Sequence, residues 1–334
     1  MTQAPANIAI IGAGAWGTAL AQVLADAGHS ISLYARSAEL AEAINAYGQN
    51  ETYLSGIYLN NNISATSIIK KAVATADIVL LVTPAQFLRS TLTEMKPHLR
   101  AGVPLISCSK GIEIATGKLL SDVAAEIIPD APYGVLSGPT FAYEVARGLP
   151  TAVTFAMRSE HAEQWARALS YRTFRLYLSH DIVGAEISGA VKNVIAIACG
   201  IVEGRNLGQN AKAAVMTRGI AEIKRLGMKR GAEADTFLGL SGLGDLTLTC
   251  NSMASRNYSL GVMLGQGRTL ANIMAERNTV AEGVTTARAI ALNAHKLHVE
   301  MPISTAVDKV LHQNADIDSV IRELLSRDLK PESQ

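Results

Sequence analysis

A glycine-rich turn near the N-terminus constrains this chain more than any other feature. The short apolar run Ile8–Ile11 leads directly into Gly12-Ala13-Gly14-Ala15-Trp16-Gly17, and a helical run follows. In this strand–turn–helix context Gly12 permits the tight turn, Gly14 lets the backbone approach a pyrophosphate, and Gly17 allows close helix–strand packing. The helix N-terminus adds unpaired N–H groups for the phosphates. The pattern predicts a dinucleotide site, and the alternative is a glycine turn without a ligand.

The balance of charged and apolar residues excludes several classes of protein. The 334 residues include 30 Lys and Arg and 29 Asp and Glu, so the net charge of +1 gives no general attraction to nucleic acid or to an anionic membrane. Hydrophobic residues make up 49% of the chain, which is enough to bury large cores and excludes global disorder. The length suits about two domains of roughly 150 residues each.

Metal, disulfide and membrane features are not expected. The three cysteines, Cys108, Cys199 and Cys250, lie far apart without a C-x-x-C pair, and only His295 and His298 have helical spacing. Residues 1–7 do not resemble a signal peptide, and the longest apolar runs are shorter than the ~20 residues that span a membrane. We therefore expect a soluble, cytoplasmic protein with no metal, no nucleic-acid partner and no membrane partner.

The first half of the chain alternates apolar strand-like runs with helical ones, which is typical of a parallel sheet with helices on both faces. The expected strands are Asn7–Ile11, Ile31–Tyr34, Ile78–Val82, Val103–Ser107 and Gly134–Leu136, with Thr151–Phe155 as a further candidate. The expected helices are Trp16–Ala27, Ala38–Ala46, Gln86–Met95 and Leu119–Ile127. Together with the glycine turn, this order predicts a Rossmann-type, doubly wound α/β sheet.

The character of the sequence changes after about His180. Ile182–Leu325 is helical almost throughout, with breaks marked by glycines near residues 204–208, 239–244 and 265–267. We expect an NAD(P)-binding domain in residues 1–180 and an all-helical domain for substrate binding and catalysis in residues 181–334. An apolar helical domain is suited to a homodimer.

The end of the second expected strand bears on the choice of cofactor. A site selective for NAD usually places Asp or Glu about 20 residues after the glycine turn, where it holds the ribose 2′-hydroxyl. Here Arg36 occupies that place and the first acid is Glu39. Because a guanidinium suits a 2′-phosphate, we favour NADP(H) as the cofactor without excluding NAD(H). The alternative is that Arg36 is an ordinary solvated residue.

The helix expected over Ile182–Val202 contains the candidate catalytic residue. It is apolar nearly all round and therefore expected to be buried, yet it carries Lys192 and Asn193 in its middle. A buried ammonium is costly unless it is paired or functional, and burial lowers a lysine pKa toward neutrality, which suits proton transfer. The alternative is that the stem of Lys192 carries its ammonium out to solvent.

Further segments offer partners for such a lysine. Gly242-Leu243-Gly244-Asp245 presents a carboxylate, and Ser255-Arg256-Asn257 offers donors for a phosphate, although a solvated loop is the alternative for the second. Lys110 and Ser137-Gly138-Pro139-Thr140 each follow an expected strand. Because ligands of open α/β sheets bind beyond the carboxyl ends of the strands, we expect these residues in the same crevice.

Together these motifs resemble one family, the bacterial NAD(P)-dependent glycerol-3-phosphate dehydrogenases. The resemblance runs from about residue 7 to residue 325, in the family's order and approximate spacing. It is carried by the segments Gly12–Gly17, Ser109–Gly111, Leu136–Ala142, Gly189–Val194, Gly242–Leu246, Ser255–Asn257, Val280–Gly283 and Glu300–Ile303. The glycine turn is common to many dehydrogenases, whereas the Lys-Asn helix followed by Gly-Leu-Gly-Asp and Ser-Arg-Asn is much more specific.

The resemblance implies roles for individual residues. It assigns catalysis to Lys192 and substrate binding to Lys110, Gly138, Thr140, Lys192, Asp245, Ser255, Arg256 and Asn257. It assigns cofactor binding to the turn glycines Gly12, Gly14 and Gly17 and to Ala15, Trp16, Arg36, Lys110, Ala142, Arg256, Val280 and Glu282. Many family members have Ser where this chain has Ala15, so one hydroxyl contact is lost while the turn itself is kept.

The implied reaction is hydride transfer between a nicotinamide and dihydroxyacetone phosphate, with Lys192 protonating the developing alkoxide and Asp245 orienting Lys192 or the substrate. The product, sn-glycerol 3-phosphate, feeds phospholipid synthesis. Two alternatives stay open. A related 3-hydroxyacid or sugar-acid dehydrogenase would bind a substrate carboxylate at Arg256, and a non-catalytic NADPH-sensing regulator would bind the cofactor without turnover.

Overall fold

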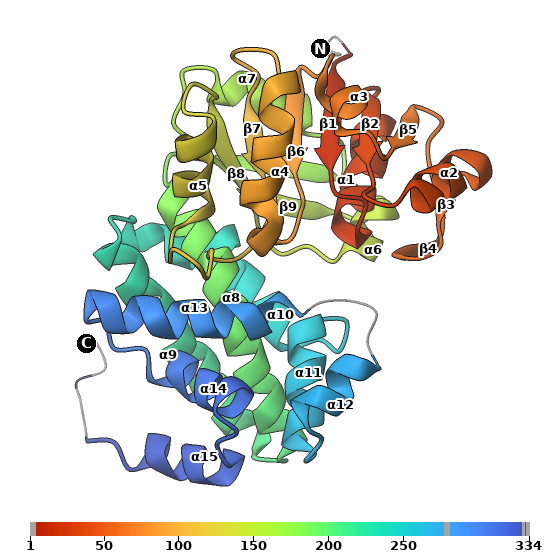
Figure 1. The fold of residues 1–334 in the computed structure, drawn as a ribbon. Coiled ribbons are helices and arrows are strands. Elements are labelled where there is room, and N and C mark those ends of the chain that lie inside the picture. The colour runs from red at the N-terminus through yellow and green to blue at the C-terminus, as the bar shows by residue number, and fades with distance from the viewer. Residues whose placement is uncertain (1–4, 277–280, 329–330, 332–334) are drawn as a thin grey trace.

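The first half of the chain folds around a large sheet in the computed structural model, which describes residues 5–276, 281–328 and 331 (Figure 1). The sheet contains β1 (Asn7–Ile11), β2 (Ser30–Tyr34), β5 (Ile63–Thr66), β6 (Ile78–Leu81), β7 (Leu105–Ser107), β8 (Tyr133–Ser137), β9 (Thr151–Met157) and β10 (Phe174–Ser179). The strand order is β10-β9-β8-β7-β6-β1-β2-β5. A separate small hairpin pairs β3 (Gln49–Asn50) with β4 (Leu54–Tyr58).

The strands from β5 across to β8 run parallel, with β1 between β2 and β6. The chain therefore crosses from one side of β1 to the other, and this reversal creates the crevice in which open α/β sheets bind ligands. At the far edge, β9 runs antiparallel to β8 and parallel to β10. The predicted Rossmann-type α/β sheet is confirmed, and β9 and β10 extend it beyond β8.

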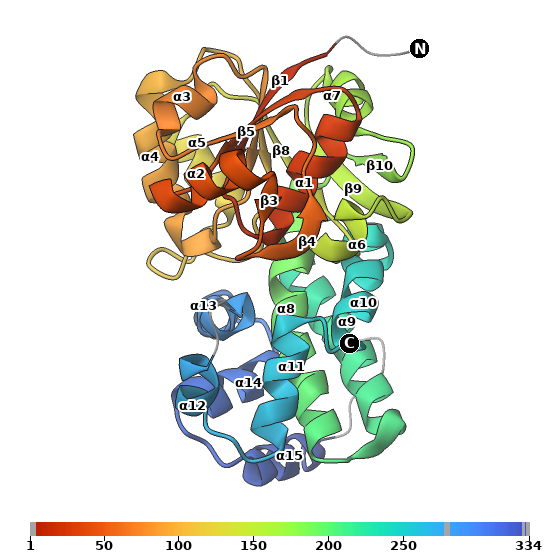
Figure 2. The same ribbon diagram turned by 90° about the vertical axis from the view of Figure 1, so that its right-hand side faces the viewer.

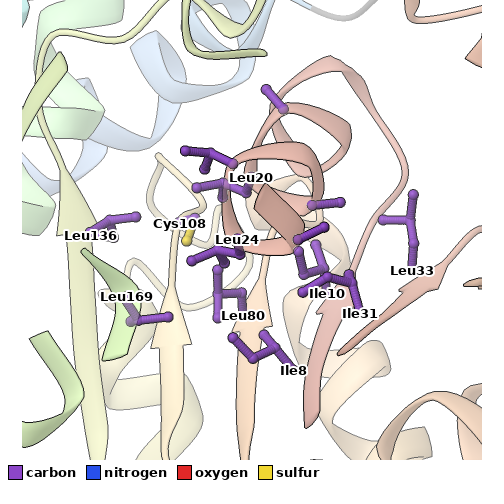
Figure 3. Packing of buried hydrophobic residues seen from close by; sticks show 14 of the residues in the cluster. Ile8, Ile10, Leu20, Leu24, Ile31, Leu33, Leu80, Cys108, Leu136 and Leu169 are labelled. Carbon is purple, nitrogen blue, oxygen red and sulfur yellow. The ribbon is translucent and has the colours of Figure 1, made fainter. Parts of the chain in front are cut away.

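Helices cover both faces of the sheet because successive strand residues point to opposite sides. Ile8 and Ile10 of β1 pack with Leu20 and Leu24 of the first helix, as Figure 3 shows. The helices on this face are α1 (Ala15–Asp26), α2 (Ala38–Tyr47), α6 (Ala142–Ala146) and α7 (Ala162–Leu169). The opposite face carries α3 (Ile69–Val73), α4 (Leu88–Met95) and α5 (Leu120–Ile127).

The predicted elements are present, with small differences at their ends that have local causes. β7 begins at Leu105, not at Val103, because Pro104 between them has no N–H to donate to a neighbouring strand. The helix expected from Gln86 begins as a 3₁₀ turn, η1 (Ala85–Phe87), before α4. The sequence did not predict the short elements β3, β4, β5, β10, α3, α6 and α7, each of eight residues or fewer, because an apolar period is hard to recognise in so short a segment.

Every described element after β10 is helical, and these helices pack around α8 (Ile182–Gly204), as Figures 1 and 2 show. They are α9 (Gly208–Lys229), α10 (Asp245–Cys250), α11 (Arg256–Gly265), α12 (Leu270–Ala275), α13 (Glu282–Leu297), α14 (Pro302–His312) and α15 (Ile317–Leu325), with the short turns η3 (Ala234–Leu238) and η4 (Leu240–Gly244). Because β10 ends at Ser179 and α8 begins at Ile182, we propose a domain boundary near residue 180, as expected from the sequence.

Among the described helices, α8 alone is long and apolar enough to cross a membrane. However, 89% of its most apolar stretch is buried inside the fold, against the helices that surround it. Burial of this kind is what the core helix of a folded domain requires, since a helix that is apolar on all sides must be covered.

α8 and α11 cross at close range through paired glycines. A Cβ on Gly261 of α11 would lie 2.1 Å from the carbonyl oxygen of Ile197, and a Cβ on Gly200 of α8 would lie 2.2 Å from that of Tyr258. Because the obstructing atoms belong to the backbone, they cannot rotate away. The close crossing holds the first turn of α11, which includes Arg256 and Asn257, beside the middle of α8.

We expect Gly261→Ala to destabilise the protein by about 1–3 kcal/mol, because the new methyl group would overlap the backbone of Ile197. The measurement is the urea unfolding midpoint of the purified protein, followed by circular dichroism. Thr217→Ala, at an exposed position of α9, is the control and should change the free energy of unfolding by less than about 0.5 kcal/mol. An unchanged midpoint for the Gly261 variant would contradict the close crossing.

Candidate active site

The carboxyl ends of the parallel strands bring several of the predicted site residues to one edge of the sheet, the edge that faces the helical half (Figure 2). Gly12 follows β1, Arg36 lies just after β2, Lys110 lies beyond β7, and Gly138 follows β8. From the other half, α8 enters this edge and carries Lys192. The crevice predicted from the strand order is therefore lined by residues from both halves.

Lys192 lies in the middle of α8, and its side chain is only 7% exposed. Its Nζ donates one hydrogen bond to Oδ1 of Asp245 and another to Oγ1 of Thr249, at 2.9 Å. Asp245 is the first residue of α10 and follows the π-helical turn η4. The ammonium is thus paired inside the protein and does not extend to bulk solvent.

A second ammonium shares the Asp245 carboxylate. Nζ of Lys110, which belongs to the sheet half, lies 2.7 Å from Oδ2 of Asp245, while Lys192 occupies Oδ1. The Lys110 side chain is 15% exposed and the Asp245 side chain 1%. Gly189 of α8 leaves room for the Lys110 stem, since a Cβ there would lie 3.4 Å from Cγ of Lys110. One buried carboxylate therefore joins the two halves of the chain.

The electrostatics of this cluster favour proton transfer by Lys192. Burial lowers the pKa of Lys192 to about 8, with the neighbouring charge of Lys110 acting in the same direction and the Asp245 carboxylate opposing both. Burial also raises the pKa of Glu282, at the start of α13, while Arg256, Lys110 and Lys192 act to lower it. These mutual effects mean that the five side chains form one group of coupled charges.

The predicted Ser-Arg-Asn segment has two buried residues, Ser255 and Asn257, and one exposed residue, Arg256. Oγ of Ser255 caps α11 by accepting from the N–H of Tyr258 at 3.2 Å. The Asn257 amide is buried: it donates to Oδ1 of Asn193 at 2.9 Å and accepts from the N–H of Gly283 at 3.0 Å. Arg256 stands between them with an exposed side chain. Ser255 and Asn257 therefore hold the local backbone, whereas Arg256 faces outward.

The glycine turn has the shape that a dinucleotide pyrophosphate requires. Gly12 has φ +128°, and a Cβ there would lie 2.8 Å from the Val82 carbonyl oxygen. A Cβ on Gly17 would lie 1.8 Å from the Gly12 oxygen, so the helix packs tightly on the turn. In contrast, a Cβ on Gly14 would meet no atom of the described residues within 4 Å. Space is therefore open at the uncapped N-terminus of α1, where free N–H groups can meet phosphate oxygens.

The other expected cofactor residues surround this turn or lie outside the described part of the chain. Trp16 packs on Phe174, with ring centres 6.5 Å apart, and Ala142 begins α6. Arg36 is exposed beyond β2, with its guanidinium carbon 6.0 Å from the centre of the Phe87 ring. Val280 lies outside the described residues.

Two expected substrate residues lie at the end of β8. A Cβ on Gly138 would lie 2.9 Å from Cα of Val153, so no larger residue fits without a shift of the neighbouring strand. Oγ1 of Thr140 donates to the Gly138 carbonyl oxygen at 3.2 Å. Both residues therefore shape the tight turn after β8.

Sequence analysis missed Thr249, which the structure places against Lys192. Its Oγ1 accepts from Lys192 and lies 2.6 Å from the backbone oxygen of Asp245, to which it donates. The signal was available, because a residue four positions after Asp245 on a helix lies on the same face. Within the described ranges, no group of three His, Cys, Asp or Glu side chains could hold a metal ion.

Known proteins are similar to this chain over nearly its whole length. Family models for the N-terminus and the C-terminus of NAD-dependent glycerol-3-phosphate dehydrogenase match residues 7–163 and 181–322. A Rhodospirillum rubrum protein named glycerol-3-phosphate dehydrogenase (NAD(P)+) is 53% identical over 333 residues, which are 99% of this chain and 95% of the relative. A Parvibaculum lavamentivorans protein of the same name is 51% identical over 334 residues, the full length of both chains.

A solved structure of the same family has the same fold. The crystal structure of glycerol-3-phosphate dehydrogenase from Coxiella burnetii superimposes with a TM-score of 0.93 at 36% identity, covering 97% of this chain and 99% of the other. The resemblance found in the sequence motifs is confirmed by these matches. The chain belongs to the glycerol-3-phosphate dehydrogenase family.

Proposed function

We propose that this protein is an oxidoreductase that interconverts dihydroxyacetone phosphate and sn-glycerol 3-phosphate with NADP(H) or NAD(H). The observation that carries the proposal is the buried ammonium of Lys192, which is linked through Asp245 to Lys110 at the carboxyl edge of the sheet. Full-length relatives that carry the corresponding name support it. The roles of the individual residues below are part of the proposal.

Lys192 acts as the acid in ketone reduction and as the base in alcohol oxidation. Its ammonium donates a proton to the oxygen that becomes negatively charged, and in the reverse direction its neutral amine accepts the hydroxyl proton. The bound cofactor supplies or accepts the hydride. A pKa of about 8 keeps both forms of Lys192 accessible near neutral pH. Asp245 and Thr249 orient the amine by accepting two of its N–H groups.

The charge of the crevice suits a phosphorylated substrate. Three cations, Lys110, Lys192 and Arg256, share it with two carboxylates, Asp245 and Glu282, so one positive charge is left over when all are ionised. Arg256 binds the substrate phosphate with its planar donor fork, helped by neighbouring groups of Ser255 and Asn257. Lys110 and the backbone around Gly138 and Thr140 close the opposite side of the substrate.

The Gly12–Gly17 turn and the backbone amides of Ala15 and Trp16 would hold the pyrophosphate of the cofactor at the sheet edge. Ala142 borders this part of the site. Lys110, Arg256 and Glu282 would hold the cofactor where it meets the substrate. Arg36 holds the 2′-phosphate of NADP(H), since no carboxylate occupies the place that would bind the 2′-hydroxyl of NAD(H).

We further propose that the protein acts in the cytoplasm as a homodimer, without a membrane or nucleic-acid partner, and supplies glycerol 3-phosphate for phospholipid synthesis. The dimer is supported by an apolar groove lined by residues of α8, α9, α14 and α15. Three large apolar side chains on this groove, Leu207, Met228 and Leu325, are exposed in the single chain. Burial of such a patch against a second copy would remove it from water.

The test of the overall function is steady-state turnover of dihydroxyacetone phosphate with NADPH and NADH side by side, and of several keto acids under the same conditions. We expect turnover of the phosphate substrate and a higher kcat/KM with NADPH. Arg36→Ala should lower kcat/KM for NADPH by roughly 10–150-fold, the effect of one lost charge-assisted hydrogen bond, and leave NADH unaffected. A preference for a keto acid, or cofactor binding without turnover, would contradict the proposal.

Lys192→Ala should lower kcat by roughly 10²–10⁴, because the proton donor is lost, while the cofactor binds with nearly unchanged affinity. Lys224→Ala, on the exposed face of α9, is the matched control and should keep full activity. In the wild-type protein, ketone reduction should decline as the pH rises through about 8, where Lys192 loses its proton. Near-normal turnover by the Lys192 variant would exclude this residue from the mechanism.

Arg256→Ala should mainly raise KM for dihydroxyacetone phosphate, by roughly 10–150-fold, since a charge-assisted hydrogen bond contributes about 1.5–3 kcal/mol. Arg172→Ala, at an exposed position between α7 and β10, is the control. Unphosphorylated dihydroxyacetone should be a poor substrate for the wild type and should be affected little by the Arg256 change. If dihydroxyacetone proves as good a substrate as its phosphate, Arg256 does not have this role.

A further inference from the structure

We propose that Glu186 is a positioning residue that anchors the catalytic helix α8 to the cofactor-binding half and thereby sets the place of Lys192 at the sheet edge. The inference rests on the proposed role of Lys192 and adds a residue that does not touch the substrate or the cofactor. It concerns a buried carboxylate on α8 that the mechanism above does not use.

The Glu186 carboxylate accepts three hydrogen bonds from the other half of the chain. It belongs to α8, yet its Oε1 accepts from the N–H of Ser121 at 2.9 Å and from the hydroxyl of Tyr133 at 2.8 Å. Its Oε2 accepts from Oγ of Ser121 at 2.6 Å. Ser121 lies in the first turn of α5 and Tyr133 begins β8. Three hydrogen bonds from two elements therefore hold one point of α8.

A carboxylate in this place is costly and is not needed for packing. Glu186 is only 5% exposed, and burial raises its pKa to about 7, although Ser121 and Tyr133 act to lower it. An apolar side chain would fill the same volume without this desolvation penalty. What an apolar side chain lacks is direction, because the hydrogen bonds of Glu186 have defined lengths and so restrict the rotation and the axial position of α8. The arrangement thus favours alignment over stability.

Glu186 and Lys192 lie on the same rigid helix. The two residues lie six positions apart on one continuous helix, which corresponds to a rise of about 9 Å. Between them, Gly189 faces Ser137: a Cβ on Gly189 would lie 3.2 Å from Oγ of Ser137. The first turns of α8 also pack on the sheet, where Ala185 contacts the cluster of Val135 and Ala156. A slide or rotation of α8 at Glu186 would therefore displace the Lys192 amine by a similar distance.

A second contact holds α5, the helix that contains Ser121, in place. Arg230, directly after α9, donates to Asp122 of α5 at 2.9 Å. Asp122 is next to Ser121, so α5 is held to the helical half on both α8 and α9. In addition, Ile112 and Leu119, which precede α5, belong to the core of the helical half. α5 is therefore a fixed support for Glu186 and not a mobile one.

The consequence is a dependence of the hydride-transfer rate on Glu186. The glycine turn of the sheet half would hold the pyrophosphate of the cofactor, whereas α8 carries Lys192, so the distance between the reacting groups depends on how α8 sits against the sheet. A misplacement of about 1 Å in an active site can lower a rate by roughly 10²-fold. Binding of the cofactor to the glycine turn involves only the sheet half and should not change.

The experiment compares Glu186→Leu with Glu186→Gln by stopped-flow single turnover at saturating substrate. Gln retains one oxygen that can accept from Ser121 and Tyr133 and an amide that can donate to the Ser121 hydroxyl, whereas Leu retains only the volume. We expect the rate constant to fall by roughly 10–100-fold in the Leu variant and by less than about threefold in the Gln variant. Glu160→Leu, at an exposed position, is the matched control.

Two readouts separate positioning from a loss of folded protein. The amplitude of the single turnover counts folded active sites, whereas its rate constant reports the geometry within them. The dissociation constant of the reduced cofactor, measured by its fluorescence without substrate, should stay within about threefold of wild type in all variants. A tenfold change would correspond to a loss of about 1.4 kcal/mol of binding free energy. A Leu variant that loses only amplitude, or a Gln variant that loses as much rate as the Leu variant, would overturn the proposal.

Substitutions of the donor residues test the same hydrogen bonds if the Glu186→Leu variant does not fold. Tyr133→Phe and Ser121→Ala each remove one donor from Glu186 and should lower the rate constant several-fold with full amplitude. Wild-type rates in both would refute the inference. The proposed function fails separately: an active Lys192→Ala variant would remove Lys192 from catalysis, whereas an inactive Lys192→Ala variant beside a fully active Glu186→Leu variant would overturn only the role of Glu186.

Discussion

The site depends on one buried carboxylate that is shared by two ammonium groups. Asp245 accepts from Lys192 of α8 and from Lys110 of the sheet half, and neither lysine has a comparable partner among the ion pairs of the described residues. Breaking a buried ion pair typically costs about 3–5 kcal/mol, because a charge is left without compensation. The two halves of the chain must therefore meet for this cluster to be stable. The same contact that joins the halves also fixes the direction of the Lys192 amine.

α8 organises the rest of the molecule around this cluster. Its first turns pack on the sheet, its middle carries Lys192, and its later turns accept α11 through the close contact at Gly200. Because these contacts lie on one rigid helix, a residue that aligns the helix at one end affects the chemistry in its middle. The apolar surface of α8 is thus the scaffold on which a few polar residues, spaced by helical turns, are presented to both halves.

The predicted site residues differ in what they do in the folded chain. Ser255 caps a helix and Asn257 joins Asn193 to Gly283, so both act on the shape of the site through the backbone. Arg256, between them, is exposed. Thr249 bonds to Lys192, although no sequence motif includes it. The residue types in a motif therefore identify the site more surely than they identify which member touches the substrate.

The sequence by itself determined the α/β alternation, the glycine turn, the all-helical second half and the family, because these depend on local periodicity and on residue types at close spacing. It also singled out Lys192, since an ammonium in an apolar helix conflicts with its surroundings. Only the tertiary structure decided that Lys110 and Lys192 share Asp245 and that Glu186 bonds to Ser121 and Tyr133. These contacts join residues that are distant along the chain, and no local pattern encodes the direction in which a packed helix presents its side chains.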